Sequence, residues 1–278
     1  MIRSLYSGSS GMKNHQVRMD VIGNNIANVN TTGFKSSRAN FQDAVYQLLR
    51  SPSAPSDDTS GAGSINPSQV GTGMSIASIG INMGQGPIQN TGRPLDLAIQ
   101  GNGFFCVTDG TNCYYTRNGV FYIDKNGFLV DSNGNQLVDG SGGSGTPGAP
   151  IQLGSGTDVV STISIGKDGA ITATNTAGDD ISPSINIGLY SFANQEGLKQ
   201  IGQSYYQEVT GTSGEATPID PDDVGVYSEI ASCYLEMSNV NLSDEFVDMI
   251  TTQRGYQANG RVITISDQML QELLDLKR

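Results

Sequence analysis

Apolar residues recur at helical spacing near both ends of this 278-residue chain. Near the N-terminus they stand seven residues apart, with two more at the alternate positions: Leu5, Met12, Met19 and Ile26, then Ile22 and Val29. A heptad spacing keeps each such residue on the side that faces a partner helix. We therefore expect a helix from about Ser4 to Val29, with a coiled-coil seam along one face.

A second helical pattern follows Ser243 and runs to Leu276, and Lys277 and Arg278 suit its C-terminus. Ser243 is its predicted N-cap, because Asp244 and Glu245 follow it and carboxylates favour the first turn of a helix. Its apolar positions are Phe246, Met249, Ile250, Tyr256, Val262, Ile263, Ile265, Met269, Leu270, Leu273, Leu274 and Leu276. Those from Val262 onward cover an arc of about 180°, which is wider than one partner helix can bury.

Both predicted helices contain glycines in their interiors, namely Gly8, Gly11, Gly23, Gly255 and Gly260. An interior glycine costs about 1 kcal/mol relative to alanine. The helices should therefore be marginal in isolation and depend on packing partners.

The middle of the chain reads as β structure. Asn-Gly or Asp-Gly pairs occur at 102–103, 109–110, 118–119, 126–127, 133–134 and 139–140. Such pairs accept the positive φ of tight hairpin turns. The strands expected around and beyond them are 114–116, 120–123, 162–165, 170–174 and 185–192. The predicted fold class is α+β: N- and C-terminal helices paired as a coiled-coil hairpin, with a β-rich middle domain of antiparallel hairpins in a meander.

Two segments rich in Ser, Pro, Gly and Asp are predicted to be loops. The first runs from Arg50 to Thr72 and reads as a linker or extended loop. The second, from Gly140 to Pro150, reads as a surface loop.

Charge and hydropathy exclude several classes of protein. The net charge is −12 with 15 Lys and Arg residues, whereas phosphate binding needs clustered cations. No run of apolar residues is long enough for a transmembrane helix, and the N-terminus lacks the apolar core of a secretory signal. We expect neither nucleic-acid binding nor membrane spanning nor conventional secretion.

No segment predicts a catalytic, cofactor or metal site. Gly101-Asn102-Gly103 begins like a dinucleotide-binding motif, but its third glycine would fall at Cys106. The segments 124–127 and 131–135 resemble calcium loops, yet they lack the closing Glu and are better explained as turns. His15 is the only histidine and has no Ser or Cys nucleophile signature near it in the sequence, so we expect a packing residue rather than a base.

The cysteines Cys106, Cys113 and Cys233 are odd in number and lack metal-ligand spacing. Cys106 and Cys113 can pair across a hairpin, or all three are small buried apolar residues.

Several motifs resemble those of flagellar rod and hook proteins. At the N-terminal end they are residues 3–8 (Arg-Ser-Leu-Tyr-Ser-Gly), 10–14 and 20–35; in the middle 91–93, 95–99 and 197–202; and at the C-terminal end 235–242, 249–250, 253–256 and 271–273. Residues 3–8, the run Leu-Glu-Met-Ser-Asn-Val and the closing Leu-Lys-Arg most resemble the short hook proteins of Gram-positive bacteria. The stretches 46–55 and 69–73 suit a distal rod protein, which carries a similar insertion after its first helix.

The resemblance implies a structural subunit of the flagellar hook, with the distal rod protein as the alternative. It would be exported unfolded by the flagellar type III apparatus, without cofactor or enzymatic activity, and would polymerise into a tube that transmits torque. An extracellular β-domain binding module or adhesin is a further alternative, but such a module would not need apolar helices at both ends. The implied location is extracellular, in the hook or basal body of the flagellum.

The implied partners are further copies of the chain, the distal rod protein, the hook cap protein, the hook-filament junction protein and the export apparatus. The implied domains are an inner assembly helix at 1–35, a linker and hairpin at 36–90, a β-rich outer domain at 91–225 and a second inner helix at 226–278. A possible export-recognition element comprises Asn28, Thr32, Gly33, Phe34 and Lys35, with a gate motif at Phe41 and Val45.

Overall fold

The computed structural model describes residues 2–53, 64–142, 148–154, 160–175, 180, 185–219 and 228–276. The chain divides into two compact units. The helical unit contains residues 1–26, 37–80 and 241–278, and the β unit contains residues 27–36 and 81–240. Helices α1 (Ile2–Ala27) and α2 (Leu242–Asp275) and the antiparallel sheets between them in sequence confirm the predicted α+β class.

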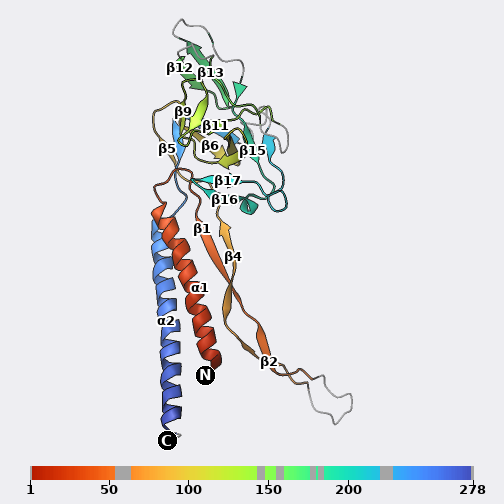
Figure 1. The fold of residues 1–278 in the computed structure, drawn as a ribbon, viewed down its shortest axis with the longest axis vertical. Coiled ribbons are helices and arrows are strands. Elements are labelled where there is room, and N and C mark those ends of the chain that lie inside the picture. Colours follow the sequence, from red (N-terminus) through yellow and green to blue (C-terminus); the bar gives the residue numbers. More distant parts are fainter. Residues whose placement is uncertain are drawn as a thin grey trace. The chain divides into compact units, whose positions relative to one another are not determined.

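Helices α1 and α2 form an antiparallel pair within the helical unit (Figure 1). Ser4 and Ser266 share a hydrogen bond of 3.1 Å near the start of α1. Near its end, the Asn25 side-chain amide donates to Glu245 Oε1 at 2.9 Å. The predicted helical hairpin is confirmed.

The predicted N-cap of α2 is wrong by two residues. The helix begins at Leu242, and Asn241 is the N-cap, with φ −92° and ψ 106°. Its side-chain oxygen accepts a hydrogen bond from the Ser243 backbone N–H at 3.1 Å. Asn and Ser are comparable N-caps, so the residue type does not distinguish Asn241 from Ser243.

The predicted coiled-coil seam of α1 is confirmed at Ile22 and wrong at its heptad residues. The buried positions of α1 are Gly8, Gly11, Asn14, Ile22 and Asn25, whereas Leu5, Met12, Met19 and Ile26 are half-buried. A Cβ atom at Gly8 would lie 3.2 Å from Ile263 Cγ1, and one at Gly11 would lie 2.7 Å from the Asn259 side-chain nitrogen. Glycine lets α2 approach closely on this face, so the apolar heptad residues are displaced to its flanks.

Two β ribbons complete the helical unit: β1 (Ser37–Asp43) with β4 (Met74–Ile81), and β2 (Tyr46–Arg50) with β3 (Ser68–Gly71). Strand β3 lies inside the predicted loop 50–72, whereas β2 precedes that loop except for Arg50. The two strands are antiparallel, with Leu48 opposite Gln69, and an isolated bridge joins Ser53 to Ile65. The loop prediction is wrong for β3, because cross-strand pairing overrides a loop-like composition.

Buried asparagines of α1 hydrogen-bond the backbone of the first ribbon. Asn14 donates to the Met74 carbonyl at 2.6 Å. Asn25 donates to the Ser37 carbonyl at 2.8 Å and accepts from the Ser37 N–H at 3.0 Å. These amides satisfy strand groups that a leucine at the same positions would leave unpaired.

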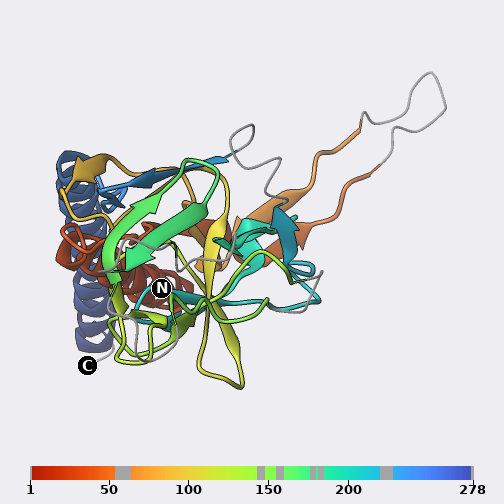
Figure 2. The ribbon, with the colours of Figure 1, turned by 90° about the horizontal axis from the view of Figure 1, so that it is seen from above.

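The β unit contains β5 (Ile88–Asn90), β6 (Leu97–Gly101), β7 (Phe104–Thr108), β8 (Cys113–Thr116), β9 (Phe121–Ile123), β10 (Leu129–Asp131), β11 (Gln136–Leu137), β12 (Val160–Ile165), β13 (Ala170–Asn175), β14 (Ile185–Asn186), β15 (Leu189–Ser191), the 3-10 helix Gln195–Gly197, β16 (Lys199–Gly202), β17 (Tyr205–Gln207), β18 (Thr217–Ile219), β19 (Ser228–Ser232) and β20 (Tyr234–Glu236). The largest sheet has the order β16-β17-β8-β7-β11-β10-β9, and β15 pairs with both β7 and β18. Smaller sheets are β19-β6, β20-β5 and β12-β13-β14, the last containing the green hairpin of Figure 2.

The predicted meander is confirmed for β9-β10-β11 and for β12-β13-β14, which are antiparallel in sequence order. It is wrong at β7, which pairs with β11 and β15 as well as with its neighbour β8. Both faces of β7 are buried. Phe105 and Val107 belong to one apolar cluster, and Phe104 and Cys106 belong to the other. Alternate side chains of a strand point to opposite faces, so this strand serves two cores at once.

The turn predictions are confirmed in part. Gly127 and Gly134 have φ of 83° and 87°, as a tight Asn-Gly turn requires. Gly119 has no such φ; a side chain there would overlap the Leu97 carbonyl oxygen. The turn between β16 and β17 was not predicted: Gln203 and Ser204 take positive φ although neither is a glycine.

No described helix is long and apolar enough to cross a membrane. Cys106 is fully buried and Cys113 is half-buried, and neither forms a disulfide.

Replacing Gly23 by alanine should stabilise the protein by about 1 kcal/mol, because nothing lies within 4 Å of the added Cβ and helix propensity improves. The same change at Gly11 should lose that gain, because the Asn259 side chain must move away from the new methyl group. Urea unfolding of both variants, followed by circular dichroism, measures the difference. Equal stabilisation would show that the helices do not pack through Gly11.

Candidate assembly surface

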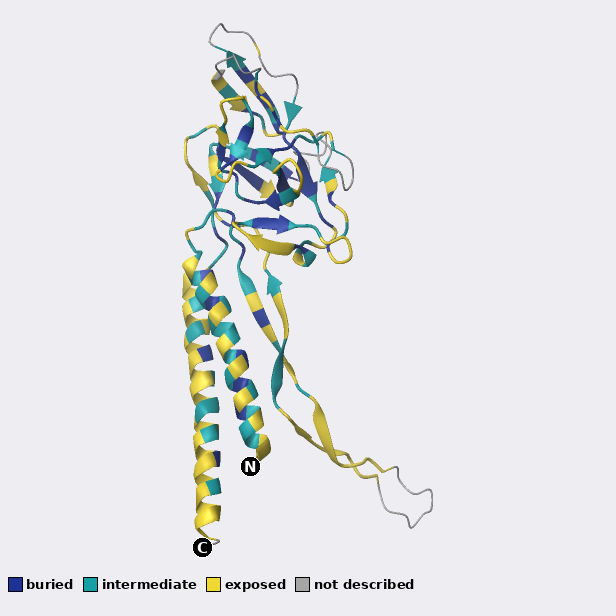
Figure 3. Cartoon of the chain, in the orientation of Figure 1, coloured by how far each residue is buried: buried dark blue, intermediate teal, exposed yellow. Residues whose placement is uncertain are grey.

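One face of α2 carries a continuous row of exposed apolar side chains, which we call the α2 stripe: Val262, Ile265, Met269, Leu273 and Leu276. They are spaced by three or four residues, so they share one side of the helix. Ile265 is 53% exposed and Leu276 is 84% exposed. Figure 3 shows that exposed residues dominate α2. A stripe of this kind on a folded chain indicates a surface that another protein covers.

The remaining predicted assembly residues of α2 fall into two groups. Phe246, Ile250, Tyr256 and Leu274 are also exposed, while Met249, Ile263 and Leu270 are half-buried. An open apolar hollow of about 400 Å³ lies between the helices, lined by Ile2, Leu5, Tyr6, Ser9 and Ile263. The predicted assembly residues therefore lie along the helix pair and its groove, and their role in assembly stays a prediction.

The ribbon formed by β2 and β3 is exposed along its whole described length (Figure 3). Its apolar side chains Tyr46, Leu48, Leu49 and Val70 are all exposed, as is Val45 just before it. Side chains at neighbouring positions such as Leu48 and Leu49 point to opposite faces. An isolated two-stranded ribbon is marginal in water, so apolar residues on both faces indicate a partner that covers it.

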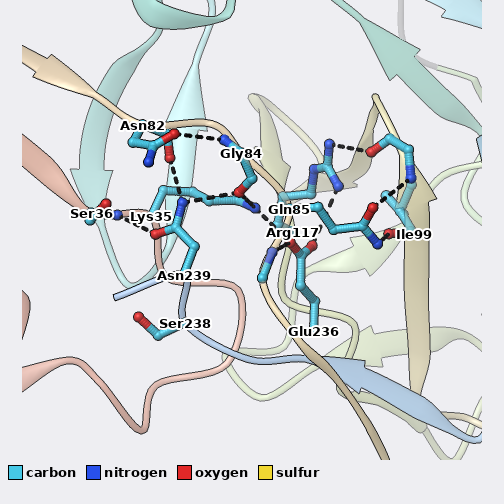
Figure 4. Close-up of polar contacts among 12 residues, drawn as sticks. Lys35, Ser36, Asn82, Gly84, Gln85, Ile99, Arg117, Glu236, Ser238 and Asn239 are labelled. Atoms are coloured by element: carbon cyan, nitrogen blue, oxygen red, sulfur yellow. Dashed lines mark hydrogen bonds and ion pairs between the residues drawn. The ribbon is translucent and has the colours of Figure 1, made fainter. Parts of the chain in front are cut away.

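The β unit contains a buried ion cluster centred on the Glu236 carboxylate (Figure 4). Lys35 Nζ lies 2.6 Å from Glu236 Oε1, and the Arg117 guanidinium lies 3.3 Å from Oε2. The Gly86 backbone N–H also donates to Oε1, at 2.8 Å. Lys35 and Glu236 side chains are fully buried, and Arg117 is nearly so.

The cations of this cluster have further partners. Lys35 donates to the Gly84 carbonyl at 3.0 Å, and Arg117 donates to the Gly101 carbonyl at 2.9 Å. Burial lowers the pKa of Lys35, and the nearby Glu236 carboxylate opposes this shift. Burial likewise lowers the pKa of Arg117. A charge taken out of water is stable only while its partners remain, so each member of the cluster depends on the others.

The cluster joins segments that are far apart in sequence. Asn239 accepts a hydrogen bond from the Ser36 N–H at 2.8 Å and donates to the carbonyls of Asn82 and Gly84 (Figure 4). The Gly33 N–H donates to the Glu236 carbonyl at 2.8 Å. Residues 33–36, 82–86 and 236–239 are thereby held together within the β unit. In the sequence Glu236 stands out only as part of a family motif. It is the single charged residue in an otherwise uncharged run, and this was the one local sign of a buried ion pair.

The predicted export-recognition residues 28–35 lie beside this ion cluster or form part of it. Thr32 donates to the Asn118 side chain at 3.0 Å, and Asn28 accepts from the Thr31 hydroxyl at 3.2 Å. Gly33 and Lys35 are buried and Phe34 is half-buried. An export role for these residues stays a prediction that concerns the unfolded chain.

The two residues of the gate motif lie in the helical unit. Phe41 is in β1, where its ring meets the His15 ring edge-on at 5.5 Å and the Arg18 guanidinium at 5.7 Å. Val45 is 78% exposed. Burial, and then the charge of Arg18, lower the pKa of His15, in keeping with a packing role for this residue.

The calcium-like segment 131–135 forms a turn. Asp131 accepts hydrogen bonds from the backbone N–H groups of Asn133 and Asn135, and the Tyr205 hydroxyl donates to it. Among the residues that the structure describes, no group of three acidic, His or Cys side chains is arranged to hold a metal ion.

Three family descriptions match the chain. "Flagella basal body rod protein" matches residues 5–35, "Flagellar hook protein FlgE/F/G D1 domain" matches residues 98–173, and "Flagellar basal body rod FlgEFG protein C-terminal" matches residues 231–276. The flagellar basal-body rod protein FlgG of Bacillus subtilis is 44% identical over 278 residues, which cover all of both chains. This chain belongs to the flagellar rod and hook protein family.

Members of both branches of the rod and hook family resemble the chain. The flagellar hook protein FlgE of Borreliella burgdorferi is 29% identical over an alignment of 446 positions that covers both chains completely. The hook protein FlgE of Treponema pallidum is 50% identical over 140 residues, which cover half of this chain and 30% of that protein. This rod/hook protein is thus a structural component of the bacterial flagellum.

Replacing Glu236 by glutamine should destabilise this rod/hook protein by about 3–5 kcal/mol, because two buried cations lose the carboxylate that both contact. The control is Glu229→Gln. Glu229 pairs with Lys167 at 3.6 Å on the surface, where a salt bridge contributes about 1 kcal/mol or less. Denaturant unfolding of both variants gives the two free energies. Equal effects would contradict a dependence of the β unit on the cluster.

Proposed function

We propose that this protein is the distal rod subunit of the flagellar basal body. The supporting observation is the end-to-end similarity to a protein named FlgG, at 44% identity over an alignment no longer than this chain. The aligned hook protein needs 446 positions to accommodate 278 residues, so it carries long insertions that this chain lacks. The hook interpretation from the sequence is therefore replaced by its alternative.

The high local identity to the Treponema hook protein is compatible with this choice. That match covers half of this chain and 30% of the hook protein. The match is confined to segments that rod and hook proteins share. The choice between rod and hook depends on similarity over the entire length of both chains. An adhesin or isolated binding module finds no support in these relatives.

The subunit works by polymerising into a tube of identical copies. The α2 stripe and the hollow beside Tyr6 supply apolar surface for contacts between copies. Because α1 contacts α2 through glycines, its half-buried apolar residues also stay near the surface. Repeated heterologous contacts of one patch with a different patch give an open helical polymer.

The ribbon of β2 and β3 would make a further contact between copies. Its exposed apolar residues on both faces match a strand pair that is covered in the assembled state. Additional contacts of this kind stiffen a polymer. A stiff polymer suits the straight rod better than the bending hook. The motor's torque then passes along the rod.

The remaining parts of the proposal follow from the family. The chain would leave the cell unfolded through the flagellar export apparatus, and it would act without catalysis or cofactor. Its partners would be other copies and the adjoining axial proteins, including the hook. Partners specific to the hook, such as its cap and the hook-filament junction protein, are not part of the rod proposal.

Replacing Ile265 by aspartate should abolish polymerisation while leaving the free energy of unfolding within about 0.5 kcal/mol of the wild type, because the side chain is exposed in the single chain. Thr264→Asp introduces the same charge at an exposed neighbouring position that points to another side of the helix, and this variant should polymerise normally. Light scattering and electron microscopy of purified protein at rising concentration distinguish the two. Normal polymers of the Ile265 variant would contradict an assembly role for the stripe.

Rod and hook can be separated by surface labelling of Lys125→Cys, an exposed position of the β unit, with the native cysteines replaced by alanine. A rod subunit should remain unlabelled in intact cells and should accept label along the straight rod of purified basal bodies. Label on a curved segment of intact cells would restore the hook interpretation. Absence from every flagellar structure would overturn both.

A further inference from the structure

The single histidine of the chain lies where three elements of the helical unit meet. A Cβ atom on Gly255 of α2 would lie 2.8 Å from both Cε1 and Nε2 of His15, so the imidazole ring lies directly on the backbone of that helix. The ring also meets the Phe41 ring of β1 edge-on, with the two centroids 5.5 Å apart. Because His15 belongs to α1, one side chain joins both helices and the first ribbon.

This contact suits a neutral imidazole ring. Nδ1 of His15 is buried, and none of the described residues forms a hydrogen bond with it. A neutral imidazole can keep its proton on Nε2, whereas an imidazolium carries an N–H on both nitrogens. Protonation would therefore place a buried N–H without an acceptor beside an aromatic ring and a helix backbone, and a buried donor without a partner is costly.

A second cation lies beside the same contact. On α1, Arg18 stands three residues further along the same side of the helix, and its guanidinium lies 5.7 Å from the centroid of the Phe41 ring. On α2, the Asp248 carboxylate binds Arg18 at 3.1 Å. On β1, Asp43 shares a face with Phe41, and β4 carries no charged residue. The carboxylate that α2 contributes is thus already paired with Arg18.

We propose that His15 is an acid-sensitive latch of the helix pair: the neutral ring holds α1, α2 and β1 together, and its protonation weakens this contact. A charged ring loses its packing environment, because a cation next to Arg18 and without an acceptor for Nδ1–H is more stable in water. The latch acts within a single chain, so it holds for a rod subunit and for a hook subunit alike. In acid, the helices that carry the proposed assembly surface should be less closely packed.

The direction of the pH dependence follows from the pKa of His15. Burial, and then the charge of Arg18, lower this pKa from its ordinary value of 6.5, and opening of the contact restores it. The stability that the neutral ring contributes is therefore fully present above pH 6.5 and is lost as the pH falls toward the pKa of the closed state. In this window opening takes up one proton, so the opening constant should rise by up to about tenfold per pH unit.

The first test is proton NMR of the full chain, in which His15 supplies the only imidazole signals. Their titration midpoint should lie below pH 6.5. Arg18→Gln removes the neighbouring charge and should raise the midpoint. Lys13→Gln removes an exposed charge from another side of α1 and should leave the midpoint unchanged. A wild-type midpoint at or above pH 6.5, or one that Arg18→Gln does not raise, would overturn the proposal.

The second test is hydrogen exchange by mass spectrometry above and below pH 6.5, with the rates corrected for intrinsic exchange. Peptides from α1, β1 and the middle of α2 should lose protection in acid, while peptides from the β unit serve as the internal reference and should keep theirs. His15→Phe retains an aromatic ring at the contact but cannot take up a proton, so it should abolish the loss.

The comparison of the two chains isolates His15 from the other titrating groups of the helix pair. Burial raises the pKa of Glu245, which the Asn25 amide contacts, but this carboxyl group is present in both chains and its effect cancels. An equal acid-induced loss in His15→Phe, an equal loss in the β unit, or no loss in the wild type would each show that His15 is not a latch.

Discussion

The carboxylate of Glu236 is the interaction on which the β unit depends most. It neutralises Lys35 from the segment before β1 and Arg117 from the turn after β8, and it accepts the Gly86 N–H. Residue 35 and residue 236 are close only after most of the chain has folded. The cluster therefore couples local strand formation to the completion of the whole unit, since a buried charge without its partner is strongly destabilising.

The helical unit pairs two helices and still leaves apolar side chains exposed. Close contact at Gly8 and Gly11 and hydrogen bonds from Asn14 and Asn25 hold α1 against its neighbours. Small and amide residues thus perform the internal packing. Larger apolar residues, such as those of the α2 stripe, remain accessible for contacts between subunits. This separation of internal packing from exposed apolar surface agrees with helices that are marginal in isolation.

Much of the fold was predictable, and the failures share one cause. Helices, several strands and the turns at Gly127 and Gly134 follow from periodicity and turn chemistry, which act over a few residues. The glycine contacts of α1, the pairing of β7 with β11 and β15, and the strand β3 within a predicted loop were missed. Each depends on which distant segment packs against the residue, and the heptad of Leu5 and Met12 carried no information about the glycine contacts to α2.

The sequence by itself determined the class of fold, the family and the surplus of apolar residues on the terminal helices, because these are recorded in local spacing and motif. Only the tertiary structure decided that Lys35, Arg117 and Glu236 form one buried cluster and that His15 packs against Gly255 and Phe41. It also decided which apolar residues of α2 remain exposed. Burial and proximity between residues far apart in sequence arise from chain topology, and the hydrophobic and electrostatic energies that depend on them have no counterpart in local sequence pattern.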